Sequence, residues 1–397
     1  MKKFVLCKLC LVVFGALLAV QSVSAGNWNK GTESSIEVDS SIEIKWPKYF
    51  AVSVFDAPNC SIPSLTTNLD KKVFAAARQL ADNSDIMPSS DSLTVIHRNI
   101  STPWKLILDA SVIAQATDEK AAKEAIVSSL VLLAEKDVFL QGATSKGGCY
   151  AGGNKNSKCG AHSANHRAYG VAAILMAASN MRADLDPKQL KSIDEYSDRA
   201  YQKLLKPEIS KHIGRRQTGF GEFGDHSITF LSYAAWKKDE KTLIATHQKF
   251  VKRVDSMFQE DGYIDNNSHR GVRGFFYHVL GTESAISAAI LFDAFGFNTL
   301  GNEDIRSRFA KSLEKVNEGL LDYEKFKAKG FRGTNITTDP ADEIWQIHPL
   351  ASNLHFIAKN WFSVELAYQP SGYLKASGAS KLSGFDAKCF FYSNGKS

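Results

Sequence analysis

Apolar side chains recur every three or four positions along most of the chain after residue 67. A period near 3.6 residues is typical of helices that bury one face, whereas strands alternate with a period of two. Alternation appears only weakly, at 36–46, and residues 26–66 are expected to be irregular or extended. Glycine and proline separate the helical stretches. The pattern predicts helices at 68–81, 118–140, 163–179, 187–205, 227–236, 240–258, 271–295, 304–321 and 342–359.

The predicted helices follow one another without a clear linker, which favours antiparallel helix pairs within one domain. We therefore expect an all-α fold, an incomplete (α/α) toroid at residues 26–397, with globin-like or bundle packing as the alternative. In such a toroid the starts of the inner helices and their loops line a central cleft. Polar residues at helix starts are therefore the first candidates for chemistry.

The first 25 residues have the pattern of a cleaved secretory signal. Lys2 and Lys3 precede an apolar stretch, and small residues Val23 and Ala25 precede the expected cleavage after Ala25. The apolar stretch is too short for a membrane anchor. We expect a periplasmic or secreted protein of bacterial type, with no membrane attachment after cleavage.

Four cysteines remain after this cleavage: Cys60, Cys149, Cys159 and Cys389. An even number in an oxidising compartment predicts two disulfides, for which the sequence allows three pairings. Cys149 and Cys159 bracket a loop rich in glycine, asparagine and lysine, which favours pairing these two and leaves Cys60 for Cys389.

Composition and charge narrow the classes of partner. With 44% hydrophobic and 23% charged residues, the chain is typical of a globular protein. Removing Lys2, Lys3 and Lys8 with the signal lowers the formal charge from +6 to +3. Nothing in this mild excess forms the basic stripe that nucleic-acid binding needs, so no nucleic-acid partner is expected. A local cationic cleft for an acidic substrate remains compatible with it, and we expect a monomer.

The stretch 220–236 carries the first candidate residues. Asp225 or Ser227 can cap the helix that begins there, and His226 then lies in its first turn. An N-cap beside an incidental histidine is the alternative interpretation.

The stretch 259–281 carries the second set. Arg270 and Tyr277 are seven residues apart and so fall on one helix face, and Arg273 lies four residues before Tyr277. A cation at this range stabilises a phenolate, and a phenol tuned in this way acts as a general base or acid. His278 follows directly. A surface arginine pair beside a tyrosine packed in the core is the alternative.

Asn165, His166 and Arg167 open another predicted helix. His162 and His166 are four residues apart, as in helical zinc sites, but Ser163 stands where a zinc protease carries glutamate and no clear third ligand follows. We therefore expect no metal and no cofactor.

Trp345 and His348 form a fourth candidate, as a platform for a sugar ring. Plain packing of an aromatic side chain at a helix start is the alternative interpretation.

The stretch "DHSITFLSYAAW", followed one helix pair later by "DGYIDNNSHRGVRGFFYH", resembles the helical-toroid alginate lyases, polysaccharide lyase family five and its relatives. In that family an Asn-Asn-His-Ser-Tyr-Trp motif opens one helix, and the next hairpin carries an arginine with Tyr-His seven residues on. Arg270 and Tyr277 keep that spacing. The helix at 163–179 is similar to the family's Arg-x-Trp helix and 343–349 to its late tryptophan-containing stretch, so the resemblance covers about residues 160–355.

This resemblance implies metal-independent β-elimination of an acidic polysaccharide, a polyuronate. It implies that Tyr277 is the base and acid, that His226 assists proton removal or holds the carboxylate side, and that Arg270 binds the carboxylate and tunes Tyr277. Asp225 completes the catalytic set. The implied substrate-binding residues are Asn165, His166, Arg167, Arg273, His278, Trp345 and His348.

Asp225 departs from the family pattern, which has asparagine before the histidine. Either Asp225 is protonated in a desolvated site and donates the hydrogen bond that asparagine would, or Asn165 or another amide neutralises the substrate carboxylate and Asp225 is only a cap. Glu222, three residues upstream, could share a proton with Asp225. The departure leaves two other functions open. One is a glycoside hydrolase that uses Asp225 and a second carboxylate, and the other is an inactive polyuronate-binding relative. Because H5 and O4 share one side of the ring in mannuronate and glucuronate, these are favoured over guluronate.

Overall fold

The computed structural model describes residues 36, 42–47, 68–82, 102–141, 161–209, 220, 226–269, 274–330 and 352–367. Within these residues the regular elements are helices, and the only β pairing is an isolated bridge between Phe258 and Ile264. The expectation of an all-α class is confirmed. The expected signal peptide and the four cysteines lie outside the described residues.

The helices in these residues agree with most of the predicted ones. The α-helices are α2 (Leu69–Asp82), α4 (Thr102–Thr117), α5 (Lys120–Glu135), α6 (Ala161–Asn180), α7 (Pro187–Ala200), α8 (Ser227–Lys237), α9 (Glu240–Met257), α10 (Gly274–Ala294), α11 (Glu303–Leu321), α12 (Tyr323–Gly330) and α14 (Ser352–Phe362). Short 3₁₀ helices span Arg182–Asp184 and Thr299–Gly301, and α7 continues as a π-helix over Tyr201–Ile209.

Two described helices, α4 and α12, have no counterpart in the sequence prediction. In α4 the buried residues spread over more than half of the helix circumference, so the apolar pattern lacks the narrow face of a typical amphipathic helix. These buried residues are Pro103, Trp104, Ile107, Leu108, Ala110, Ser111, Ile113 and Ala114. In α12 the helix spans only eight residues, too few for a clear period.

Several helix starts are set by local capping. Asp186 caps α7 and forms a reciprocal capping box with Gln189, with Pro187 in the first helical position. Asp239 caps α9 and Asn302 caps α11 through side-chain oxygens that accept backbone N–H groups. These contacts involve residues close in sequence, so the sequence itself determines where these helices begin.

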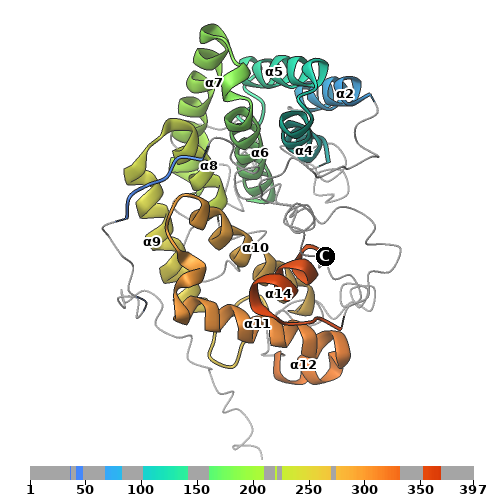
Figure 1. Ribbon diagram of the computed structural model, residues 1–397, viewed down its shortest axis with the longest axis vertical. Coiled ribbons are helices and arrows are strands. Elements are labelled where there is room, and N and C mark those ends of the chain that lie inside the picture. The colour runs from blue at the N-terminus through green and yellow to red at the C-terminus, as the bar shows by residue number, and fades with distance from the viewer. Residues whose placement is uncertain are drawn as a thin grey trace, which may run out of the picture. The chain divides into compact units, whose positions relative to one another are not determined.

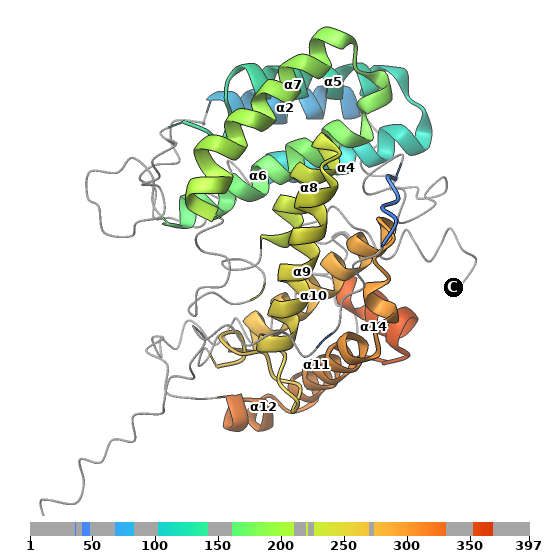
Figure 2. The same ribbon diagram turned by 90° about the vertical axis from the view of Figure 1, so that its left-hand side faces the viewer.

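Neighbouring helices pack in a continuous series (Figure 1). α2 contacts α4 and α5, α4 contacts α6, α6 contacts α8, and α8 contacts α9. A second view shows α8 beside α6 and α9, and α10 beside α11 (Figure 2). Short turns at 118–119 and 238–239 join α4 to α5 and α8 to α9, as in helix hairpins.

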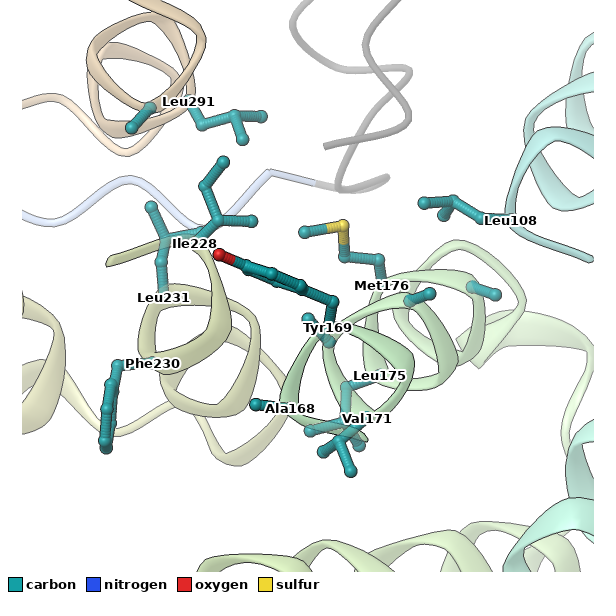
Figure 3. Packing of buried hydrophobic residues seen from close by; sticks show 14 of the residues in the cluster. Leu108, Ala168, Tyr169, Val171, Leu175, Met176, Ile228, Phe230, Leu231 and Leu291 are labelled. Atoms are coloured by element: carbon teal, nitrogen blue, oxygen red, sulfur yellow. The ribbon is translucent and has the colours of Figure 1, made fainter. Parts of the chain in front are cut away.

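The interface of α6 and α8 is a tightly filled part of the core (Figure 3). Tyr169 and Met176 of α6 lie beside Ile228 and Leu231 of α8, and Leu291 of α10 closes this cluster from above. All five side chains are buried. This packing fixes the start of α8, where His226 lies, against α6.

α10 is apolar on all sides and is buried on nearly all of them. Of the described helices it alone is long and apolar enough to cross a membrane, and 94% of its most apolar window is buried inside the protein. This burial is that of a core helix. Non-helical residues 42–47 pack beside its end, where Lys45 N–H donates to the Phe295 carbonyl at 3.0 Å.

Candidate functional site

His226 holds the N-cap position of α8, one residue away from both Asp225 and Ser227, and its side chain makes no capping hydrogen bond. Its side chain is only 1% exposed. The imidazole stacks on the ring of Tyr169 from α6, with centroids 5.0 Å apart and planes at 27°. Its Nδ1 lies 3.5 Å from Oγ1 of Thr229. The ring is therefore oriented by the packing of α6 against α8.

Tyr277 lies in the first turn of α10, and it differs from its neighbours in exposure. Residues 274–276 and 278–280 are buried, whereas Tyr277 is only half-buried. Its ring meets the ring of Phe276 edge-on, with centroids 5.2 Å apart. Tyr277 is therefore the least buried residue of this helix start.

Asn267 connects the start of α10 to Phe220, six residues before His226 in the chain. Its Oδ1 accepts the Phe220 N–H at 2.7 Å. Its Nδ2 donates to the Phe220 carbonyl at 2.9 Å and to the Tyr277 carbonyl at 2.6 Å. Asn267 is not among the site residues that the sequence predicts. Its only signal is its place three residues before Arg270, and asparagine is common in turns.

His278 is completely buried, unlike Tyr277 beside it. Its Nδ1 lies 2.8 Å from Oγ of Ser268, and its Nε2 lies 3.1 Å from the carbonyl of Ser312 in α11. Burial lowers the pKa of His278 to about 4, so its ring is neutral at neutral pH. Direct substrate contact, as expected from the resemblance, does not fit this position. The contacts are those of a core histidine that ties α10 to its neighbours.

Arg167 of α6 is fully buried. Its Nη1 donates to the carbonyl of Gln141, but among the described residues no acceptor meets its Nε or Nη2. Burial lowers the pKa of the Arg167 guanidinium to about 10, which leaves it a cation at neutral pH. A buried cation with unpaired N–H groups is costly unless an anion reaches it. Arg167 is as buried as His278, so direct substrate contact does not fit its position either, and its carboxylate role stays an expectation of the resemblance.

The remaining candidates are only partly within the described residues. Asn165 and His166 belong to α6, but their side chains lie outside the described residues. Also outside are Asp225, Glu222, Arg270, Arg273, Trp345 and His348. The structure thus describes His226, Tyr277, Arg167 and His278 from the predicted set.

The part of the chain that the structure describes has no group of three or more histidine, cysteine, aspartate or glutamate side chains that could hold a metal ion. The described site residues offer a phenol, a stacked imidazole and a buried guanidinium. These groups suit proton transfer and the binding of a carboxylate.

Comparison with known proteins bears on the fold. No protein-family model matches the chain, and no curated protein sequence matches it significantly. Two structures of one alginate lyase are among the solved structures that are similar. The crystal structure of alginate lyase A1-III from Sphingomonas species A1 has a TM-score of 0.51 and 13% identity, and the match covers 76% of this chain and 79% of that one. A histidine-to-alanine variant of the same lyase in complex with a tetrasaccharide has a TM-score of 0.51 and 13% identity, with 75% and 79% covered.

At this identity the likeness concerns the fold. It confirms the expectation of an (α/α) incomplete toroid, which the helix packing of the described residues already fits. It also agrees with the resemblance on which the sequence analysis drew. The chain therefore has the all-helical fold of alginate lyase A1-III.

Proposed function

We propose that the protein is a polysaccharide lyase that cleaves a polyuronate by β-elimination. The observation that carries this proposal is the position of Tyr277, half-buried at the start of an otherwise buried helix and joined through Asn267 to Phe220. The alginate-lyase fold and the Arg270–Tyr277 spacing support the same reaction.

The proposed reaction balances without a cofactor. Tyr277, as phenolate, takes the C5 proton of the uronate beside its carboxylate. The electron pair left at C5 forms the C4=C5 double bond as the bond from C4 to O4 breaks. Tyr277 returns its proton to the departing O4. Stabilising the enolate-like charge on the carboxylate is the largest demand on such a site.

The carboxylate is the group that cationic residues must meet. Arg270 is proposed to bind it and to stabilise the phenolate of Tyr277, with Arg273 and Asn165 as further polar contacts. Arg167 adds a cation whose Nε and Nη2 lack acceptors among the described residues. His226, fixed by its stack on Tyr169, is proposed to assist proton removal.

Asp225 takes the place of an asparagine in the family motif, and an ionised aspartate there would repel the substrate. We propose that it is protonated when substrate is bound, so that it donates the hydrogen bond an amide would. His166, Trp345 and His348 are proposed to bind sugar rings of the substrate. His278 then acts from the core and holds the helix that carries Tyr277.

The substrate we favour is polymannuronate or a glucuronate-containing polymer. In both sugars H5 and O4 lie on the same side of the ring, so one tyrosine can serve both steps, whereas guluronate needs the opposite geometry. An oligosaccharide complex of the structurally similar lyase agrees with a sugar polymer as the substrate. We place the protein in the periplasm or outside the cell, as a monomer.

The test is ultraviolet absorbance of the C4=C5 double bond. Purified wild type, Tyr277→Phe and Tyr201→Phe are incubated with polymannuronate, polyguluronate and glucuronan. Tyr201 is a matched control because it is also half-buried and stacks on Tyr233, with centroids 4.7 Å apart. Wild type and Tyr201→Phe should produce the absorbance, and Tyr277→Phe should reduce it at least about 1,000-fold, since Tyr277 both takes the C5 proton and returns it to O4.

Two results would contradict the proposal. New reducing ends without absorbance would indicate a hydrolase built around Asp225. Binding of a polyuronate without any product would indicate an inactive relative that has kept only the sugar-binding surface.

A further inference from the structure

Three segments that carry the candidate residues meet at one buried side chain. They are Phe220 in the stretch before α8, the turn 265–269 before Arg270, and the first turn of α10 with Tyr277. Asn267, in the middle of the turn, is 1% exposed and touches the other two segments.

The hydrogen bonds of Asn267 use both N–H groups and the oxygen of its amide. The oxygen binds the Phe220 N–H at 2.7 Å, and the nitrogen binds the carbonyls of Phe220 at 2.9 Å and Tyr277 at 2.6 Å. A side chain with only donors or only acceptors cannot replace it. Space for the amide depends on Gly281, since a Cβ there would lie 2.5 Å from its nitrogen.

The turn itself is held by a different residue. Ser268 Oγ accepts the Ile264 N–H at 2.8 Å and lies 2.8 Å from Nδ1 of His278. Loss of the Asn267 amide would therefore leave the turn attached to α10. What it would remove is the link between the Tyr277 carbonyl and the backbone of Phe220.

We propose that Asn267 is a positioning residue, which holds the backbone of Tyr277 against Phe220 and so sets the place of the Tyr277 side chain. This role rests on the proposed lyase function. A shift of about 1 Å between reacting groups is enough to cost about 100-fold in rate. The bond to the Tyr277 carbonyl acts directly on the residue that would transfer the proton.

The first test compares Asn267→Ala with Asn180→Ala. Asn180 is also fully buried, and its Nδ2 donates to Oγ of Ser111 at 3.0 Å, between α6 and α4. Both variants should melt at lower temperature than wild type. At an assay temperature where all three are folded, Asn267→Ala should lower kcat about 100-fold with little change in KM, and Asn180→Ala should stay within about threefold.

A second variant, Asn267→Asp, adds a signature that a merely structural role would not produce. Its carboxylate would still accept the Phe220 N–H but would face the carbonyls of Phe220 and Tyr277 without a donor. Protonation restores one donor. The kcat of Asn267→Asp relative to wild type should therefore rise as the pH falls, at temperatures where both remain folded.

The outcomes separate the two proposals. If wild type forms no unsaturated product from any of the three polymers, the lyase function and the positioning role fall together. If wild type is active and folded Asn267→Ala keeps kcat within about threefold, only the positioning role is overturned. If Asn267→Ala does not fold, Asn267→Asp is the test instead. If the kcat of Asn267→Asp relative to wild type does not change with pH, the positioning role is overturned.

Discussion

His278 couples the stability of the fold to pH. It is completely buried in α10, and burial lowers its pKa from 6.5 to about 4. The unfolded chain takes up a proton near pH 6.5 while the folded state resists it. The stability that a neutral His278 contributes is therefore complete above pH 6.5 and is lost as the pH falls from 6.5 toward 4.

We expect His278→Asn to flatten this pH dependence. Between pH 7 and pH 5 the wild type should lose about 2 kcal/mol more unfolding free energy than the variant, at about 1.4 kcal/mol per pKa unit. Urea denaturation at the two pH values measures the difference. His247, whose pKa burial lowers to about 3, is a matched control in α9. His247→Asn should flatten the dependence of unfolding free energy on pH similarly, without lowering lyase activity. If the unfolding free energies of wild type and His278→Asn changed equally with pH, this account would be wrong.

At the scale of elements, the first turn of α10 lies directly against the turn 265–269. A Cβ at Gly274 would lie 2.3 Å from the backbone oxygen of Ser268, which real contacts do not allow. Ser268 has little freedom to retreat, because its hydroxyl holds Ile264 and contacts His278. Glycine at this helix start therefore permits the close approach that places Tyr277.

Gly274→Ala is expected to cost about 1–3 kcal/mol of unfolding free energy, the usual range for overpacking, and to lower lyase activity beyond that loss. Ser287→Ala in the same helix is the control. Within the described part of the chain its buried hydroxyl has no hydrogen-bond partner, so removing it should be neutral or stabilising. Thermal melts and the absorbance assay measure both effects. If Gly274→Ala kept the stability and activity of wild type, the turn 265–269 could move away from α10 without cost, and this account would be wrong.

At the scale of the whole molecule, the predicted disulfides would join distant parts of the sequence. A bond between Cys60 and Cys389 closes a loop of most of the chain, and the chain-entropy model gives about 5 kcal/mol for loops of this order. Peptide mapping without reductant should find Cys60–Cys389 and Cys149–Cys159. Reduction should lower the melting temperature of wild type. A Cys60→Ser/Cys389→Ser variant should melt at a lower temperature than wild type even without reductant. Free thiols at these four cysteines in protein purified without reductant would contradict the pairing.

Local patterns account for the parts of this protein that its sequence predicts. Helical periodicity and caps such as Asp186, Asp239 and Asn302 involve residues within a few positions of each other, so they identify most of the described helices and several of their starts. The spacing of Arg270 and Tyr277 is local in the same sense. The apolar pattern did not predict α4, because its buried residues cover more than half of the helix circumference and leave no clear one-sided period.

Tertiary structure alone decided which polar residues belong to the core and which remain accessible. Tyr277 and His278 are adjacent in sequence, yet Tyr277 is half-buried, whereas His278 is completely buried and contacts Ser312 of α11. Asn267 resembles any turn asparagine until packing brings Phe220, 47 residues earlier, within hydrogen-bond distance. Such contacts depend on how helices distant in sequence pack, and no local period or spacing encodes that arrangement.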